Sequence, residues 1–209
     1  MLKYGCGIRV LLWRLEEASR LLELCSEAGI IVDDLVGLPL KRQREQAAER
    51  LLLCHAFGRP VSLAHTEQGA PYIDGLDVNI SISHTPQLVA LALSEEHAIG
   101  IDAEQMDRCQ VLRVRDKFLN DREKQFIAPD DLEGHIIAWT AKEAIIKAER
   151  NSALDWTNGI TLERFALEGI EYGEITFTAS CDDRCYRLTS RVIDGHCITL
   201  AAETDGVGQ

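Results

Sequence analysis

The segment Trp139–Lys147, with the sequence WTAKEAIIK, has the spacing of an α-helix. Apolar residues recur at helical intervals through positions 136–148, which predicts an α-helix. Trp139, Glu143 and Lys147 follow one another at intervals of four, so they share one face of that helix. One helical face therefore carries a carboxylate and an ammonium group a single turn apart.

The segment GIDAE at positions 100–104 has the alternation of a β-strand. Asp102 and Glu104 then point to one side of the strand, and Ile101 and Ala103 point to the other. Together with Glu143 and Lys147, these carboxylates are suited to gather around a hard cation and a phosphate. The alternative is that the alternating acids mark a solvated strand face and that Glu143 and Lys147 form an ordinary helical ion pair.

The amino-acid composition of the chain argues against several classes of function. The chain has 209 residues, 46% of them hydrophobic, and a net charge of -12. Such an acidic chain argues against general nucleic-acid binding, which needs a basic surface. No apolar run approaches the roughly 20 residues of a membrane helix, and Arg9 and Arg14 bracket the apolar segment 10–13, which argues against a signal peptide. Seven cysteines without a CxxC pair indicate free thiols and a cytoplasmic protein.

The order of predicted elements repeats once along the chain, so the sequence predicts an α+β fold of two similar halves, 1–104 and 105–209, in one compact unit. Each half places helices before an antiparallel meander. The predicted helices are 17–28, 40–57, 106–127 and 135–150. The predicted strands are 8–14, 78–83, 88–93, 98–104, 160–165 and 174–179, followed by a hairpin around Asp194-Gly195. Two halves within one chain make a monomer the simplest assembly.

Four segments, in this order, resemble the motifs of the 4'-phosphopantetheinyl transferase superfamily. They are ISHT at 82–85, GIDAE at 100–104, FLNDRE at 118–123 and WTAKEAIIK at 139–147. The chain is similar to the longer, single-chain members that activate peptide and polyketide synthases. It departs from them at Gly69-Ala70-Pro71, where the family has a lysine in the middle position, and at Ser81, where an asparagine is common.

The resemblance implies a fold and a reaction. Each half would pack a helix on a small antiparallel sheet, the halves would be related by a pseudo-twofold axis, and the active site would lie in the cleft between them. The reaction would be the Mg²⁺-dependent transfer of 4'-phosphopantetheine from coenzyme A to a serine of an apo acyl or peptidyl carrier protein. The sequence does not indicate which carrier protein is modified.

The resemblance also implies residue roles. Asp102, Glu104 and Glu143 would bind Mg²⁺, and Lys147 would hold a diphosphate oxygen and stabilise the transition state. Glu123, at the acidic position of FLNDRE, is a second candidate for the general base, and the sequence does not decide between Glu123 and Glu143.

Residues of the first half and of the long helix would bind coenzyme A. Ser83 and His84 would contact its 3'-phosphate, and Lys142 its pantetheine or adenosine side. Arg44 and Arg50 lie where the family places basic residues near coenzyme A phosphates. Two other functions stay open: a degenerate module that binds coenzyme A or a carrier protein without turnover, and an unrelated metal-dependent hydrolase using the same carboxylates.

Overall fold

A computed structural model describes residues 2–3, 7–167 and 173–204 of the chain. The chain folds into two compact units, residues 1–96 and 97–209. The division falls eight residues before the boundary expected from the sequence, because the strand that carries GIDAE pairs with the last strand of the chain. Among the described residues, no helix combines the length and the hydropathy of a membrane span.

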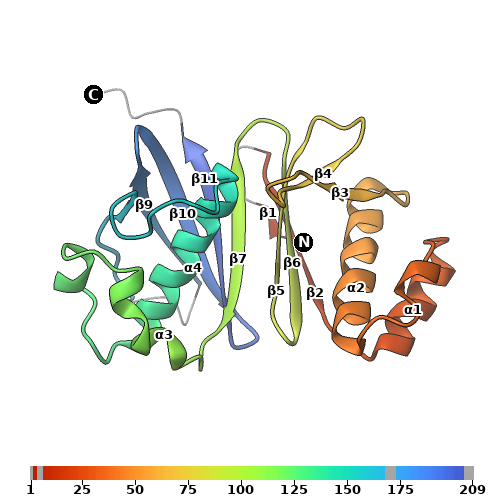
Figure 1. Ribbon diagram of the computed structural model, residues 1–209, viewed down its shortest axis with the longest axis horizontal. Coiled ribbons are helices and arrows are strands. Elements are labelled where there is room, and N and C mark those ends of the chain that lie inside the picture. Colours follow the sequence, from red (N-terminus) through yellow and green to blue (C-terminus); the bar gives the residue numbers. More distant parts are fainter. Residues whose placement is uncertain (1, 4–6, 168–172, 205–209) are drawn as a thin grey trace. The chain divides into compact units, whose positions relative to one another are not determined.

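In the first unit, helix α2 packs on a four-stranded antiparallel sheet and helix α1 packs on α2 (Figure 1). The sheet order is β1-β2-β6-β5, and a short hairpin, β3 and β4, forms a separate two-stranded sheet. Leu21, Leu53 and Leu91 are fully or almost fully buried where the helices meet the sheet. The elements are β1 Leu2–Lys3, β2 Arg9–Arg14, α1 Ala18–Glu27, η1 Asp33–Leu35, α2 Leu40–Phe57, β3 Leu63–His65, β4 Pro71–Ile73, β5 Asn79–His84 and β6 Leu88–Ser94.

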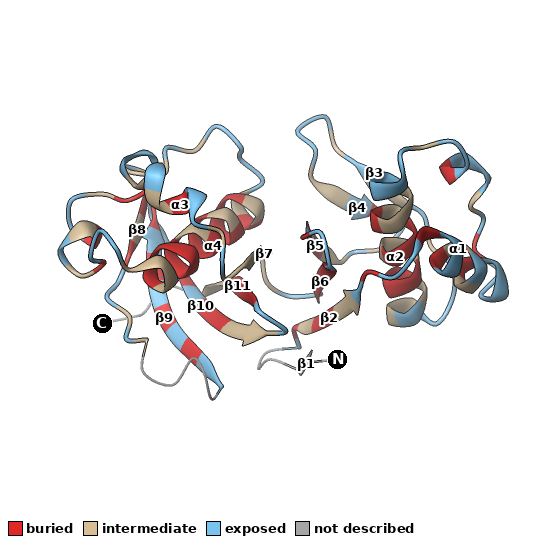
Figure 2. Ribbon diagram, turned by 90° about the horizontal axis from the view of Figure 1, so that it is seen from below, coloured by how far each residue is buried: buried red, intermediate tan, exposed pale blue. Residues whose placement is uncertain are grey.

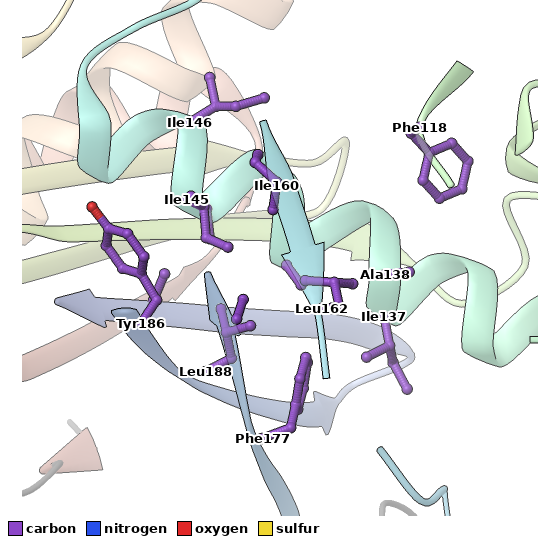
Figure 3. Close-up of a cluster of buried hydrophobic side chains, with 14 of the residues drawn as sticks. Phe118, Ile137, Ala138, Ile145, Ile146, Ile160, Leu162, Phe177, Tyr186 and Leu188 are labelled. Atoms are coloured by element: carbon purple, nitrogen blue, oxygen red, sulfur yellow. The ribbon is translucent and has the colours of Figure 1, made fainter. Parts of the chain in front are cut away.

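The second unit packs one long helix on a five-stranded antiparallel sheet of order β7-β11-β10-β9-β8 (Figure 1). Along β9, buried and exposed residues alternate, as Figure 2 shows, so one face of this strand meets the core. In Figure 3, Ile145 of the helix lies with Phe177 and Leu188 of the sheet in the core. The elements are β7 Ile99–Gln105, α3 Gln110–Arg113, η2 Arg115–Lys117, η3 Glu123–Gln125, α4 Leu132–Glu149, β8 Ile160–Leu162, β9 Glu174–Cys181, β10 Arg184–Ile193 and β11 His196–Thr204.

The structure confirms the predicted α+β class, with antiparallel sheets in both units. Each unit pairs an early strand with its last strand, β2 with β6 and β7 with β11, and each carries one long helix between them in sequence. A pseudo-twofold relation between the units, and an active site between them, stay predictions.

The predicted helix over residues 106–127 is wrong. The segment contains the four-residue helix α3 and two 3-10 turns, η2 and η3. Asn120 and Glu123 explain part of the break, because each side chain accepts the other's main-chain N–H, both at 2.9 Å. Such side-chain bonds replace the hydrogen bonds of a continuing helix. The strand predicted over 160–165 is also shorter, ending at Leu162.

Local chemistry fixes several other element ends. The predicted helix 40–57 matches α2, and Gly58 follows it with a left-handed φ of 67°. The hairpin between β10 and β11 turns at Asp194 and Gly195, whose φ values of 51° and 75° are those of a two-residue turn with left-handed residues. At the start of α4, the Asp131 carboxylate accepts the N–H of Gly134 at 2.9 Å.

Candidate functional site in the second unit

Helix α4 rests directly on strand β7 at Gly100. A Cβ at this position would lie 1.8 Å from the carbonyl oxygen of Ala144 and 2.8 Å from the nitrogen of Ala148. Only a residue without a side chain permits so close an approach of helix and strand. The glycine of GIDAE therefore brings the main chains of β7 and α4 together next to the acidic positions.

Asp102 and Glu104 lie on the face of β7 that α4 covers. They alternate with Ile101 and Ala103, so they share the face of Gly100. In the sheet, Asp102 is opposite Thr199 of β11, and the hydroxyl of Thr199 lies 2.7 Å from that of Thr140 in α4. This hydrogen bond joins α4 to the face of the sheet that carries Asp102 and Glu104. The alternation of residues in the strand and the spacing of residues in the helix had predicted that these side chains gather.

Lys147 joins α4 to β7. Its Nζ donates to Oδ1 of Asp102 at 2.7 Å and to the carbonyl oxygen of Ile101 at 3.0 Å. The Asp102 side chain is 10% exposed and that of Lys147 28%. The ammonium group thus meets a mostly buried carboxylate and a main-chain oxygen at once. The predicted proximity of Lys147 to the strand acids is present.

Glu104 pairs with Arg108. The guanidinium of Arg108 donates through Nη1 to Oε2 of Glu104, and its carbon atom lies 5.3 Å from the ring centroid of Trp139 on α4. A cation over an indole face is attracted by the ring quadrupole. This contact was not predicted from the sequence. Glu104 was expected in a strand and Arg108 in a separate helix, and a spacing of four residues indicates a side-chain contact only within one helix.

Glu143 occupies the middle of the α4 face, one turn from Trp139 and one turn from Lys147. Among the described residues it has no cationic group within 4 Å. Burial raises the pKa of Glu143, and the negative charges of Asp102 and Glu104 raise it further, while Lys147 and Arg108 oppose the shift. The three predicted metal ligands are therefore close enough to influence one another.

The donor set suits a hard divalent cation. Mg²⁺ takes carboxylate oxygens together with substrate phosphate and water, and the charges of Asp102 and Glu104 on β7 act on Glu143 of α4. In the described part of the chain, however, no three His, Cys, Asp or Glu side chains already stand at metal-binding spacing. Asp102 and Glu104 are instead held by Lys147 and Arg108. Binding of a metal ion would therefore require these carboxylates to exchange partners.

Glu123 and Lys142 lie elsewhere, in the interior of the unit. Both side chains are 0% exposed, and Nζ of Lys142 lies 2.8 Å from Oε2 of Glu123. Lys142 also donates to the carbonyl oxygens of Trp156 and Ile160, and the second oxygen of Glu123 accepts the N–H of Leu162 at 2.9 Å. The pair joins α4 to η3 and β8. In this position neither residue reaches a ligand, so the structure does not bring them to the acidic cluster.

The remaining candidates belong to the first unit. His84, at the end of β5, lies with Nε2 3.3 Å from Oε2 of Glu49 on α2. Both residues line a cavity of about 810 Å³, as do Arg42 and Arg50. Ser83 is only 5% exposed, and as the neighbour of His84 in a strand it points to the opposite face.

The two arginines of α2 differ in their surroundings. Arg50 lines the cavity and is held by Asp34 in two hydrogen bonds of 2.8 and 2.5 Å. Arg44 instead donates to the main-chain carbonyl oxygens of Glu16 and Leu15 at 2.7 and 3.1 Å. Arg44 is therefore occupied in joining α2 to the segment before α1. The sequence did not predict Glu49 or Asp34 as partners, because neither lies near its cation in the chain.

Strand β7 and helix α4 thus bring Asp102 and Lys147 into contact, with Glu104 and Glu143 close by. Residues 98–201 match the model of the 4'-phosphopantetheinyl transferase superfamily. This match covers nearly all of the second unit, including β7, α4 and the whole acidic cluster. The chain belongs to this superfamily, and it is a transferase of the phosphopantetheinyl type. No curated protein matches the chain.

Proposed function

We propose that the protein transfers 4'-phosphopantetheine from coenzyme A to a serine of an apo carrier protein, with Mg²⁺ as cofactor. The observation that carries this proposal is the arrangement around Glu143, an acid without a cationic partner within 4 Å among the described residues, between two acids that are paired. A Mg²⁺ ion that binds these carboxylates together with the diphosphate of the donor supplies the positive charge that such a site lacks.

Each residue of the cluster has a defined task in this proposal. Asp102, Glu104 and Glu143 would hold the metal ion, which neutralises charge on the leaving phosphate. Lys147 would turn from Asp102 toward a phosphate oxygen and stabilise charge in the transition state. Of the two candidate bases, Glu143 is the accessible one, since Glu123 is enclosed with Lys142. As the general base, Glu143 would accept the proton of the serine hydroxyl.

The first unit would supply the donor site. His84 and Arg50 line a cavity large enough for part of a nucleotide, and we propose that they contact the phosphates of coenzyme A. Lys142, Arg44 and Ser83 are not part of this proposal, because they are buried or bonded to the protein itself. The buried thiols of Cys25, Cys181 and Cys197, which form no disulfide, agree with a reducing, cytoplasmic environment.

One observation favours a second candidate, a module that binds without turnover. The cations of the cavity already face carboxylates, His84 with Glu49 and Arg50 with Asp34, and the family lysine is replaced by Ala70. Both features weaken the attraction of an anionic donor. The second unit, however, keeps Asp102, Glu104, Glu143 and Lys147 at the positions of the family motifs, so we place the transferase first.

One assay distinguishes these functions. The protein is incubated with coenzyme A labelled in the pantetheine, an apo carrier protein and Mg²⁺, with parallel samples in EDTA and with a carrier whose acceptor serine is replaced by alanine. A transferase labels the carrier that keeps its acceptor serine and not the alanine variant, and it does so only when Mg²⁺ is present. Donor binding without label on the carrier supports the binding module. Release of labelled fragments without a carrier supports a hydrolase.

A further inference from the structure

The carboxylate of Glu104 uses both of its oxygens in the structure. Oε1 accepts the main-chain N–H of Gln105 at 3.0 Å, and Oε2 accepts the guanidinium of Arg108. The Glu104 side chain is 14% exposed and that of Arg108 39%. A metal ion that binds Glu104 through Oε2 must therefore take the position that a half-exposed arginine now holds.

Arg108 has a second contact, with an aromatic ring of α4. Its guanidinium lies over the ring of Trp139, on the α4 face that carries Glu143 one turn further on. The other strand acid is held differently, because Lys147 is fastened to the carbonyl oxygen of Ile101 as well as to Asp102. Lys147 thus keeps a main-chain partner when Asp102 turns to another ligand, whereas Arg108 would keep the indole of Trp139.

We propose that Arg108 is a positioning residue, the counter-cation built in for Glu104, and that metal binding displaces it. The proposal rests on the proposed function, since it assumes that Glu104 is a metal ligand. The step exchanges one cation for another on the same carboxylate oxygen: the Arg108–Glu104 hydrogen bond breaks, the metal–oxygen bond forms, and no proton is transferred. Metal binding is then coupled to the release of a guanidinium group beside Trp139.

The first test measures metal affinity without donor or carrier. Mn²⁺ is titrated into the full chain, and the free ion is followed by electron paramagnetic resonance. Arg108→Met removes the competitor, and because a half-exposed ion pair is worth at most about 1 kcal/mol, Mn²⁺ should bind about three- to fivefold more tightly. Arg108→Lys should stay close to wild type. The matched control is Arg113→Met, which removes an exposed arginine that has no contact with Glu104.

The second test follows the exchange by tryptophan fluorescence. In a background with both Trp13→Phe and Trp156→Phe, where Trp139 is the remaining tryptophan, Mg²⁺ should alter the emission as the guanidinium leaves Glu104, and Arg108→Met should abolish this response while the metal still binds. Unchanged emission during metal binding overturns the exchange. The exchange is also overturned if Arg108→Met binds Mn²⁺ no more tightly than wild type does. In that case the carboxylates still bind the metal ion, but Arg108 does not compete with it. Failure of the wild-type chain to bind Mn²⁺ overturns both the exchange and the metal site of the proposed function.

Discussion

A Cβ added to Gly100 would lie 1.8 Å from the main-chain oxygen of Ala144. Since that oxygen belongs to the helix and not to a mobile side chain, it cannot move aside alone. The distance between β7 and α4 is therefore set by the absence of a side chain at Gly100. Asp102, two residues along the same strand face, meets Lys147 because of this close approach.

Gly100→Ala should separate the helix from the strand. Overpacking in a close-packed region costs typically about 1–3 kcal/mol, so the free energy of unfolding should fall by that amount, and Mn²⁺ affinity should fall with it. Urea denaturation and metal titration measure the two effects. Gly173→Ala is the control, because a Cβ there meets no atom within 4 Å. Equal stability of Gly100→Ala and the control would contradict the role given to Gly100.

The raised pKa of Glu143 predicts a pH-dependent stability difference. A carboxyl group whose pKa is higher in the folded state binds its proton more tightly there, so its contribution is favourable at low pH and is lost as pH rises through the folded pKa. Glu143→Gln removes the ionisable group, so the variant does not lose this stability as the pH rises. The variant should therefore be more stable than wild type at neutral pH, and the difference should shrink as pH falls toward the ordinary range of a glutamate.

Urea denaturation of both proteins at a series of pH values, without metal, measures this difference. If the Glu143→Gln variant is less stable than wild type at neutral pH, or if the difference does not depend on pH, the carboxylates are not crowded as described.

Lys142 and Glu123 should matter for stability. Removing one member of a fully buried ion pair leaves an uncompensated charge and costs about 3–5 kcal/mol. Lys142→Met should lower the free energy of unfolding by about this amount, and replacing Glu123 by Gln in the same chain should recover part of it. Denaturant unfolding of the single and double variants measures the coupling. A Lys142→Met variant with wild-type stability and weakened coenzyme A binding would restore the role expected from sequence.

His84 offers a test of the donor site. If its imidazole contacts the 3'-phosphate, His84→Ala should weaken coenzyme A more than 3'-dephospho-coenzyme A, as measured by calorimetry. Glu49→Gln should have the opposite effect, because it removes the carboxylate that now faces His84. His65→Ala, in the lining of the same cavity, is the control. Equal losses for the two cofactors would show that His84 has a structural role.

The period of apolar residues was enough to predict β7 and α4 and the shared face of Glu143 and Lys147. It placed Lys142 on another face of the helix but did not predict that this face is buried, because α4 is buried around most of its circumference, including His135, Thr140 and Lys142. When polar residues are buried as well, the apolar pattern no longer tells which of them meet a ligand. The partner of Lys142 lies nineteen positions away, in a segment predicted as a continuous helix.

The wrong prediction of a helix over residues 106–127 has a related cause. Residues 106–127 have helical periodicity, yet the mutual side-chain bonds of Asn120 and Glu123, and the burial of Glu123 with Lys142, favour short turns. The bonds between Asn120 and Glu123 are local, but the contact of Glu123 with Lys142 is tertiary, and a local pattern of apolar residues does not contain it. Arg108 and Glu49 were missed for the same reason, since their importance lies in partners brought near by the fold.

The most direct test of the central claim is the rate at which an apo carrier protein gains the mass of phosphopantetheine in the presence of Mg²⁺ and coenzyme A. Wild type and Asp107→Asn, which neutralises an exposed acid just after β7, should modify the carrier at similar rates. Asp102→Asn should be slower by about 100-fold or more, because it removes a metal ligand and its charge, while remaining folded. Transfer by Asp102→Asn at the wild-type rate would contradict the assignment of this carboxylate to the metal site.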